Sequence, residues 1–146
     1  MNEININTQD NKIPVYDGKI ADFCNKVLKV LEINNWEVSV LFCNDDFIRD
    51  LNKKYRNIDS PTDILSFGQG KIINNSEMYV AGDIIISLNT LSRNAGKYNV
   101  SREEELKRLL IHGLLHLNGM EHSEKDRKMI ELQETILEGL IKESIL

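Results

Sequence analysis

The feature that most constrains this chain is an eleven-residue segment, HGLLHLNGMEH, that holds all three of its histidines, His112, His116 and His122. Apolar residues before and within it recur at helical spacing, which predicts a largely buried helix through the first two histidines. The residues of this stripe are Leu106, Leu109, Leu110, Leu114 and Leu117. Ser101 and Glu104 have the spacing of a capping box, so we expect the helix to begin just after Ser101.

The spacing of the histidines predicts a metal site. Residues four apart on a helix project from one face, so His112 and His116 are placed to share a cation. Gly119 tolerates a left-handed conformation, which would end the helix and allow His122 to fold back as a third ligand. Imidazole is the commonest protein ligand for zinc, and three protein ligands leave a fourth position for water. We therefore predict one zinc or similar divalent ion in a site suited to catalysis.

Two other interpretations of the histidines stay open at this point. The metzincin peptidases share the spacing in their motif H-E-x-x-H-x-x-G-x-x-H, and Gly119 stands at its glycine. Gly113, however, replaces the glutamate that serves those peptidases as general base, so a zinc peptidase would lack an obvious base. Alternatively, the histidines are buried and satisfied by backbone hydrogen bonds, which suits one histidine better than three at this spacing.

The rest of the chain predicts strands mixed with helices, followed by a helical C-terminal part. Period-two alternation and β-rich runs predict strands over residues 3–7, 36–42, 64–67 and 78–87. Apolar periodicity predicts helices over about 18–33 and, capped by Asn44 or Asp45, over 46–55. Residues 68–77 are expected to form a loose hairpin tip. This order predicts one α/β or α+β domain over residues 1–146.

Ser123 and Asp126, three positions apart, have the spacing of a helix start, so the last helix is expected to begin with this segment. Its predicted inward-facing residues are Met129, Ile130, Leu137, Leu140 and Ile141.

Composition narrows the class of protein. Of the 146 residues, 41% are hydrophobic and 28% charged, as in soluble globular proteins. The net charge of −5 argues against a surface that coats nucleic acid but leaves room for a local basic groove. Cys24 and Cys43 lie in apolar stretches and are expected to be reduced and buried. No signal peptide or membrane span is visible, so we expect a cytoplasmic protein.

Lys53, Lys54 and Arg56 form the compact basic cluster upstream of the histidines, around Tyr55. Cations are favoured near the C-terminus of a helix, so a solvated helix end explains the cluster on the residues alone. The functional alternative is a phosphate clamp, because the planar fork of Arg can bind two oxygens.

Three segments together resemble a known family. They are residues 51–67, LNKKYRNIDSPTDILSF, then GDI at 82–84, and then residues 112–122, which are similar to H-G-x-L-H-L-x-G-x-D-H. In this order they resemble the signatures of the bacterial YbeY endoribonucleases. Two departures are Glu121, where the family usually has Asp, and Gly68, where it usually has Pro. Glu121 could still orient a ligand histidine from the second shell.

The resemblance implies a metal-dependent, single-strand-specific endoribonuclease that matures ribosomal RNA, notably the 3′ end of the 16S rRNA, and acts in ribosome quality control. It implies an α/β sandwich, with a small mostly parallel sheet packed with helices and the histidine helix near the C-terminus on one side. It places zinc on His112, His116 and His122, and it makes Arg56 the residue that engages substrate phosphate. Ribosomal proteins or a ribosome-associated GTPase are the expected protein partners, and no membrane is expected.

The working hypothesis is metal-assisted cleavage of a phosphodiester, with Arg56 and His116 as catalytic residues. The general base is unassigned. Glu121 is nearest in sequence, and Glu105 is expected to be a solvated helix charge. Asp63 and Asp83 could equally be turn or hydrogen-bonding residues. Attack by water and by the RNA 2′-hydroxyl both stay open. The alternatives are a zinc peptidase and a non-catalytic ribosome-assembly module in which the metal is structural.

Overall fold

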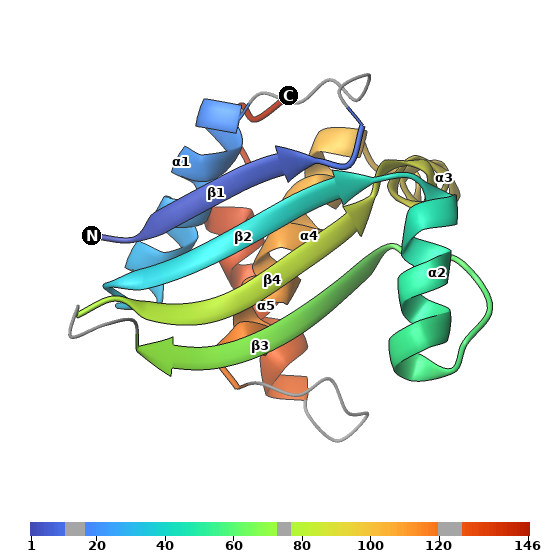
Figure 1. Cartoon of the computed structure of the whole chain (residues 1–146). Helices are drawn as coiled ribbons and strands as arrows, with labels where there is room; N and C mark the ends of the chain where they lie inside the picture. Colours follow the sequence, from blue (N-terminus) through green and yellow to red (C-terminus); the bar gives the residue numbers. More distant parts are fainter. Residues whose placement is uncertain (11–16, 73–76, 120–126) are drawn as a thin grey trace.

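The computed structural model describes residues 1–10, 17–72, 77–119 and 127–146. Within them, four strands form one sheet that helices cover (Figure 1). The strands are β1 (Glu3–Thr8), β2 (Trp36–Cys43), β3 (Ile64–Ile72) and β4 (Tyr79–Ser87). The helices are α1 (Asp17–Val30), α2 (Asp45–Arg56), α3 (Leu88–Tyr98), α4 (Arg102–Leu117) and α5 (Arg127–Gly139).

The sheet is mostly parallel, as expected. Its strand order is β1-β2-β4-β3. β1 and β4 both pair in parallel with β2, while β3 runs antiparallel along β4 as an edge strand. Parallel neighbours need crossover connections, which α1 supplies between β1 and β2. The predicted α/β class is therefore confirmed.

The two faces of the sheet are covered unequally. Figure 1 shows α1, α4 and α5 on one face and α2 near the strand ends on the other. The face toward α1 and α4 carries the main core, to which alternate strand residues such as Val40, Phe42 and Ile84 contribute with no exposed surface. A smaller apolar cluster beside α2 contains Ile48 and Leu65. The histidine helix α4 is thus packed directly on the core.

Gly113 lets α4 approach β4 closely. A Cβ atom at this position would lie 2.9 Å from Cδ1 and 3.1 Å from Cγ1 and Cγ2 of Ile84. Ile84 is fully buried and cannot move into solvent. Contacts this short require atoms to shift, so glycine is the residue that this helix–strand distance demands.

Asp45 holds the start of α2 against α3. Asn44 is the N-cap of α2, since its Oδ1 accepts from the Phe47 amide at 2.9 Å. Asp45 instead accepts hydrogen bonds from Ser87 Oγ, Thr90 Oγ1 and Arg93, each at 2.7 Å. Burial opposes ionisation of the Asp45 carboxyl, but these hydrogen bonds outweigh it and lower its pKa below 3.8. The carboxylate therefore fixes the position from which α2 extends.

Two expectations about the strands and helices were wrong. β3 continues to Ile72, so Gly68 to Ile72 belong to a strand that carries a register shift, and not to a loose hairpin tip. Helix α1 ends at Val30 and not at Ile33, because Glu32 adopts a left-handed conformation with φ 58°.

The inward face of α5 was predicted only in part. Met129 and Leu137 are buried and Leu140 packs against the core, but Ile130 and Ile141 are exposed. The predicted start of this helix, at Ser123 and Asp126, lies outside the described residues.

Both cysteines are free and buried, as expected. Burial raises the pKa of each thiol to about 12, with the nearby Asp45 carboxylate adding to the effect at Cys43. Of the described helices, none has the length and apolar character needed to cross a bilayer.

The substitution Gly113→Ala tests the close approach of α4 to β4. Alanine favours a helix by about 1 kcal/mol over glycine, but overpacking costs about 1–3 kcal/mol. We expect a net loss of roughly 1 kcal/mol in the free energy of unfolding, measured by urea denaturation. The control is Gly96→Ala in α3, where the added Cβ meets nothing within 4 Å. That variant should be stabilised, and equal gains for both would contradict the packing argument.

The substitution Asp45→Asn tests the anchor of α2. Because hydrogen bonds to charged groups contribute about 1.5–3 kcal/mol, we expect Asp45→Asn to lower the free energy of unfolding by about 1–2 kcal/mol near neutral pH. The lowered pKa means that this advantage is present above 3.8 and is lost as the pH falls through the folded-state value. Denaturation curves across this range should therefore converge in acid. A difference that grows in acid would refute the assignment.

Candidate functional site

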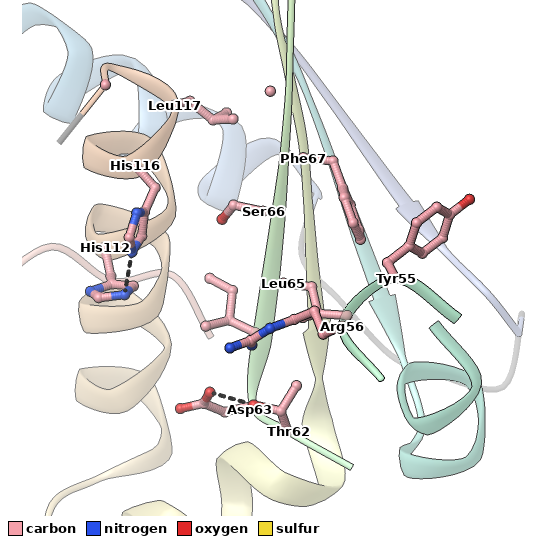
Figure 2. A pocket seen from close by; sticks show the side chains of 13 residues that line it. Tyr55, Arg56, Thr62, Asp63, Leu65, Ser66, Phe67, His112, His116 and Leu117 are labelled. Atoms are coloured by element: carbon pink, nitrogen blue, oxygen red, sulfur yellow. Dashed lines mark hydrogen bonds between the residues drawn. The ribbon is translucent and has the colours of Figure 1, made fainter. Parts of the chain in front are cut away.

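A cleft of about 640 Å³ opens at the β3 edge of the sheet, between that strand, the end of α2 and the last turns of α4 (Figure 2). It brings together two segments that are some distance apart in the sequence. The described residues that line it are Tyr55, Arg56, Thr62, Asp63, Ile64, Leu65, Ser66, Phe67, Gly68, His112, His116, Leu117 and Gly119. The cleft thus contains the predicted phosphate-binding arginine and both described histidines.

His112 and His116 lie on one face of α4, as their spacing predicted. Their ring centroids are 4.5 Å apart, and the two Nε2 atoms approach to 3.0 Å. Two imidazole nitrogens that bind one tetrahedral zinc ion at about 2.0–2.1 Å lie roughly 3.3 Å apart. A small opening of the pair would therefore admit a cation, and the donor atoms suit zinc.

The third predicted ligand, His122, and the predicted second-shell residue Glu121 lie outside the described residues. Within the described ranges, no group of three His, Cys, Asp or Glu side chains is arranged to hold a metal. The expected end of the helix is confirmed, since α4 stops at Leu117 and Gly119 has φ 83°. The three-histidine site therefore stays a prediction of which the structure describes two members.

Gln133 of α5 contacts His112 through the ring nitrogen that does not face His116, and it was not predicted as a site residue from the sequence. Its Oε1 lies 2.7 Å from Nδ1 of His112, and its side chain is buried. One signal could have revealed it. Gln133 occupies the inward stripe of α5 together with Met129, Ile136 and Leu137, and a polar residue in a buried stripe needs a hydrogen-bond partner.

Arg108 forms a cluster of ion pairs next to Gln133. It pairs with Glu105 at 3.1 Å, with Glu134 at 3.1 Å and with Glu104 at 3.3 Å. Burial would lower the pKa of Arg108, but hydrogen bonds to Glu134 and Glu105 outweigh it, so the guanidinium stays charged. Burial likewise opposes ionisation of Glu134, yet hydrogen bonds from Arg108 and Gln133 lower its pKa.

The prediction that Glu105 is a solvated helix charge was wrong. Glu105 is 3% exposed and is held by Arg108, because the first turns of α4 are covered by α5. It lines a neighbouring hollow together with His112 and Gln133, and it does not line the cleft. Its carboxylate therefore forms an ion pair with Arg108 outside the cleft.

Arg56 is the last residue of α2 and reaches toward α4 (Figure 2). The helix stops there because Asn57 adopts a left-handed conformation with φ 60°, and its amide donates to the Lys53 carbonyl at 3.2 Å. The amide of Ile58 then donates to the Asn52 carbonyl at 3.3 Å. Lys53 and Lys54 do not line the cleft, so Arg56 is the member of the basic cluster placed to meet a ligand there.

The two aspartates named as possible bases lie on different sides of the sheet. Among the described residues that line the cleft, Asp63 is the one with a carboxylate. Asn94 Nδ2 and Thr62 Oγ1 each lie 3.4 Å from this carboxylate. Asp83 accepts from Gln69 Nε2 at 2.8 Å and lines a hollow on the face opposite α4. The described geometry therefore leaves Asp63, and not Asp83, within the cleft.

Two aromatic rings stand beside Arg56. Tyr55 and Phe67 pack edge to face with their centroids 5.1 Å apart, and Tyr55 is 57% exposed. The ammonium group of Lys54 lies 5.2 Å from the centroid of the Tyr55 ring. Both rings also line the hollow on the face opposite α4, and Figure 2 shows them across β3 from the histidines. Aromatic surface and positive charge thus meet at the edge strand beside the cleft.

The position of Gly113 also argues against a peptidase. In the peptidase motif this position carries the glutamate base next to the metal. Here it faces Ile84 of β4, where even a Cβ atom has no room. A longer side chain could not be accommodated without moving α4 from the sheet, so the absence of the base follows from the packing.

Comparisons with known proteins agree with this description. The family model described as Endoribonuclease YbeY matches residues 3–141. An Endoribonuclease YbeY from Treponema denticola is 51% identical over 124 residues, which are 82% of this chain and 80% of that protein. One from Treponema pallidum is 42% identical, over 94% of this chain and 89% of its own. The solution structure of TM1509 from Thermotoga maritima is 26% identical, with a TM-score of 0.62 over 92% of this chain and 87% of its own.

The substitution Arg108→Met tests whether Glu105 depends on its ion pair. It would leave the buried Glu105 carboxylate without its cation, and breaking one partner of a buried pair costs about 3–5 kcal/mol. We expect chemical denaturation to show a loss near the lower end of this range. The double variant Arg108→Met with Glu105→Met should recover most of the stability. A double variant as unstable as the single one would show that packing of Arg108, and not its charge, is what matters.

Proposed function

The chain belongs to the YbeY family of endoribonucleases, and on that premise we propose that it cleaves single-stranded RNA in the cleft between α4 and Arg56. Its proposed substrate is ribosomal RNA, in particular the 3′ end of the 16S rRNA. The observation that carries the proposal is the convergence of the His112 and His116 Nε2 atoms in the same cleft as the Arg56 guanidinium.

We propose that His112, His116 and His122 hold one zinc or similar divalent ion. The two described rings supply nitrogen donors of the type that zinc prefers, and their Nε2 atoms already face each other. A bound ion would supply Lewis acidity that polarises a phosphoryl oxygen and lowers the pKa of coordinated water.

Arg56 is the residue that binds and orients the phosphate. Its planar guanidinium can donate two parallel hydrogen bonds to two phosphate oxygens, a fixed fork geometry that the ammonium group of lysine lacks. Because Arg56 approaches from α2 while the histidines approach from α4, a phosphate between them would be held from two sides. As negative charge builds up on the phosphate in the transition state, the guanidinium offsets it.

The aromatic pair supports a single-stranded substrate. Exposed aromatic rings bind unpaired bases by stacking, with little dependence on sequence. Tyr55 offers such a ring next to Arg56 but across β3 from the histidines, so a base of an RNA strand that continues past the edge of the sheet can stack there. A base paired in a duplex is not free to stack in this way.

The net charge and the two cysteines indicate where the reaction takes place and with which partners. With a net charge of −5, the chain has little general attraction for RNA, so a ribosomal protein or a ribosome-associated GTPase would supply part of the specificity. The two buried free thiols suit a reducing compartment, and we propose the cytoplasm.

The decisive experiment measures bound metal and RNA cleavage on the same samples. Wild-type protein purified without chelators should contain one divalent ion per chain and cleave a single-stranded RNA. His116→Ala should lose both. Wild-type protein that cleaves RNA equally well after complete removal of metal would contradict the proposal.

Arg56→Ala should lower kcat/KM for single-stranded RNA roughly 100-fold, because it removes one group that stabilises the transition state. The metal content should not change, since Arg56 lies on a different helix from the histidines. The control is Lys53→Ala, which removes a cation from the same helical turn but outside the cleft. A comparable loss in both variants would indicate general attraction of RNA in place of a specific phosphate contact.

The products identify the attacking group. A 5′-phosphate with a 3′-hydroxyl end would indicate attack by water, whereas a 2′,3′-cyclic phosphate would indicate attack by the RNA 2′-hydroxyl. Mass spectrometry of a short oligonucleotide after cleavage distinguishes the two.

A further inference from the structure

The back of the histidine pair carries a chain of hydrogen bonds that reaches from α4 to α5. Arg108 donates to both carboxylate oxygens of Glu134, at 3.1–3.3 Å. Glu134 Oε2 in turn accepts from Gln133 Nε2 at 3.2 Å, and Gln133 Oε1 lies 2.7 Å from His112 Nδ1. Each link determines which atom can donate in the next.

The direction of this chain follows from the chemistry of its groups. An ionised carboxylate only accepts hydrogen bonds, so the Gln133 amide must present its NH₂ group to Glu134. The carbonyl oxygen of the same amide then points to His112, and a carbonyl oxygen also only accepts. His112 Nδ1 must therefore carry a hydrogen, which in a neutral imidazole leaves the lone pair on Nε2.

We propose that Gln133 is a positioning residue for the metal site, which fixes the ring of His112 in the Nδ1–H tautomer and directs its Nε2 lone pair into the cleft. The inference rests on the proposed metal binding by the histidines. His112 Nε2 is the atom that faces His116 and would bind the metal. The proton therefore lies on Nδ1, the ring nitrogen that is hydrogen-bonded to Gln133.

The burial of these groups strengthens the influence of Gln133 on the tautomer of His112. Gln133 is 7% exposed and lies on the inward stripe of α5, so water cannot readily replace its carbonyl. The Arg108 ion pairs keep Glu134 ionised, and an ionised Glu134 prevents the Gln133 amide from turning over. Helix α5, which carries no proposed metal ligand, thereby orients the ring of His112 on α4.

The test compares zinc affinity in three variants, by competition with a chromophoric chelator. Gln133→Met keeps the volume but removes the acceptor, and we expect zinc to bind about 10–100-fold more weakly. The double variant Gln133→Glu with Glu134→Gln exchanges the two side chains, so that an oxygen still accepts from Nδ1–H and no two carboxylates are brought together at these positions. Its zinc affinity should stay within about threefold of wild type. The matched control Gln69→Met removes an amide that donates to Asp83 on the opposite face, and its affinity should not change.

Melting temperatures of the metal-free variants are compared first, so that a loss of folding is recognised. If the exchanged double variant binds zinc as weakly as Gln133→Met, any change at this position disturbs the site by packing, and the proposal fails. It also fails if Gln133→Met binds zinc as tightly as wild type.

A second measurement needs no variant. Long-range ¹H–¹⁵N NMR spectra of the metal-free wild type report the tautomer of each histidine ring, and His112 should be protonated on Nδ1. Protonation of His112 on Nε2 would overturn the proposal. If wild type shows the expected tautomer but binds no zinc, the proposed metal function fails while the hydrogen-bond assignment stands.

Discussion

The contact between Gly113 and Ile84 is the constraint on which the site depends. It sets the distance between α4 and β4 to one that only glycine allows, and it seats the apolar side of the helix on the main core. Neighbouring residues on a helix point about 100° apart, so His112 cannot face β4 in the same direction as Gly113. His112 lines the cleft beside the edge strand β3, and His116, one turn later, lines it too. The same contact leaves no space for the glutamate of a peptidase. Gly113 therefore sets the packing of α4 and also excludes a glutamate at this position.

The opposite wall of the cleft is fixed independently. Asp45 ties the start of α2 to α3, and Asn57 ends the helix immediately after Arg56. A helix anchored at its start and ended directly after Arg56 fixes where the backbone of Arg56 lies at the edge of the cleft. Because the two walls belong to different helices, the proposed metal-binding and phosphate-binding roles can be tested separately by substitution.

Much of this could be predicted from the sequence, because it depends on local periodicity. The spacing of His112 and His116 predicted a shared face, Gly119 predicted the end of α4, and the strand pattern predicted the sheet. Arg56 could not be assigned from charge alone, since a cation at a helix end is also favourable in solvent; the resemblance of its segment to a family supplied the role. Whether Arg56 engages phosphate stays a prediction, and the structure supports it only by placing the side chain in the cleft.

What the sequence did not predict depends on contacts between distant segments. Glu105 was expected in solvent because nothing local indicates that α5 covers the start of α4 and that Arg108 neutralises it. Gln133 was missed because it is 21 positions from His112 and its partner is set by how two helices pack. Polar residues in otherwise apolar helical stripes are the signal for such pairs, and they identify the residues that orient a site from outside it.

The proposed chemistry requires His112, His116 and His122 to bind one divalent ion together. X-ray absorption spectroscopy of the zinc-loaded protein tests it most directly, because it reports the type and distance of the atoms around the metal. Three imidazole nitrogens and one oxygen are expected, all at about 2.0–2.1 Å from the metal. Sulfur ligands, or fewer than three imidazoles, would contradict it.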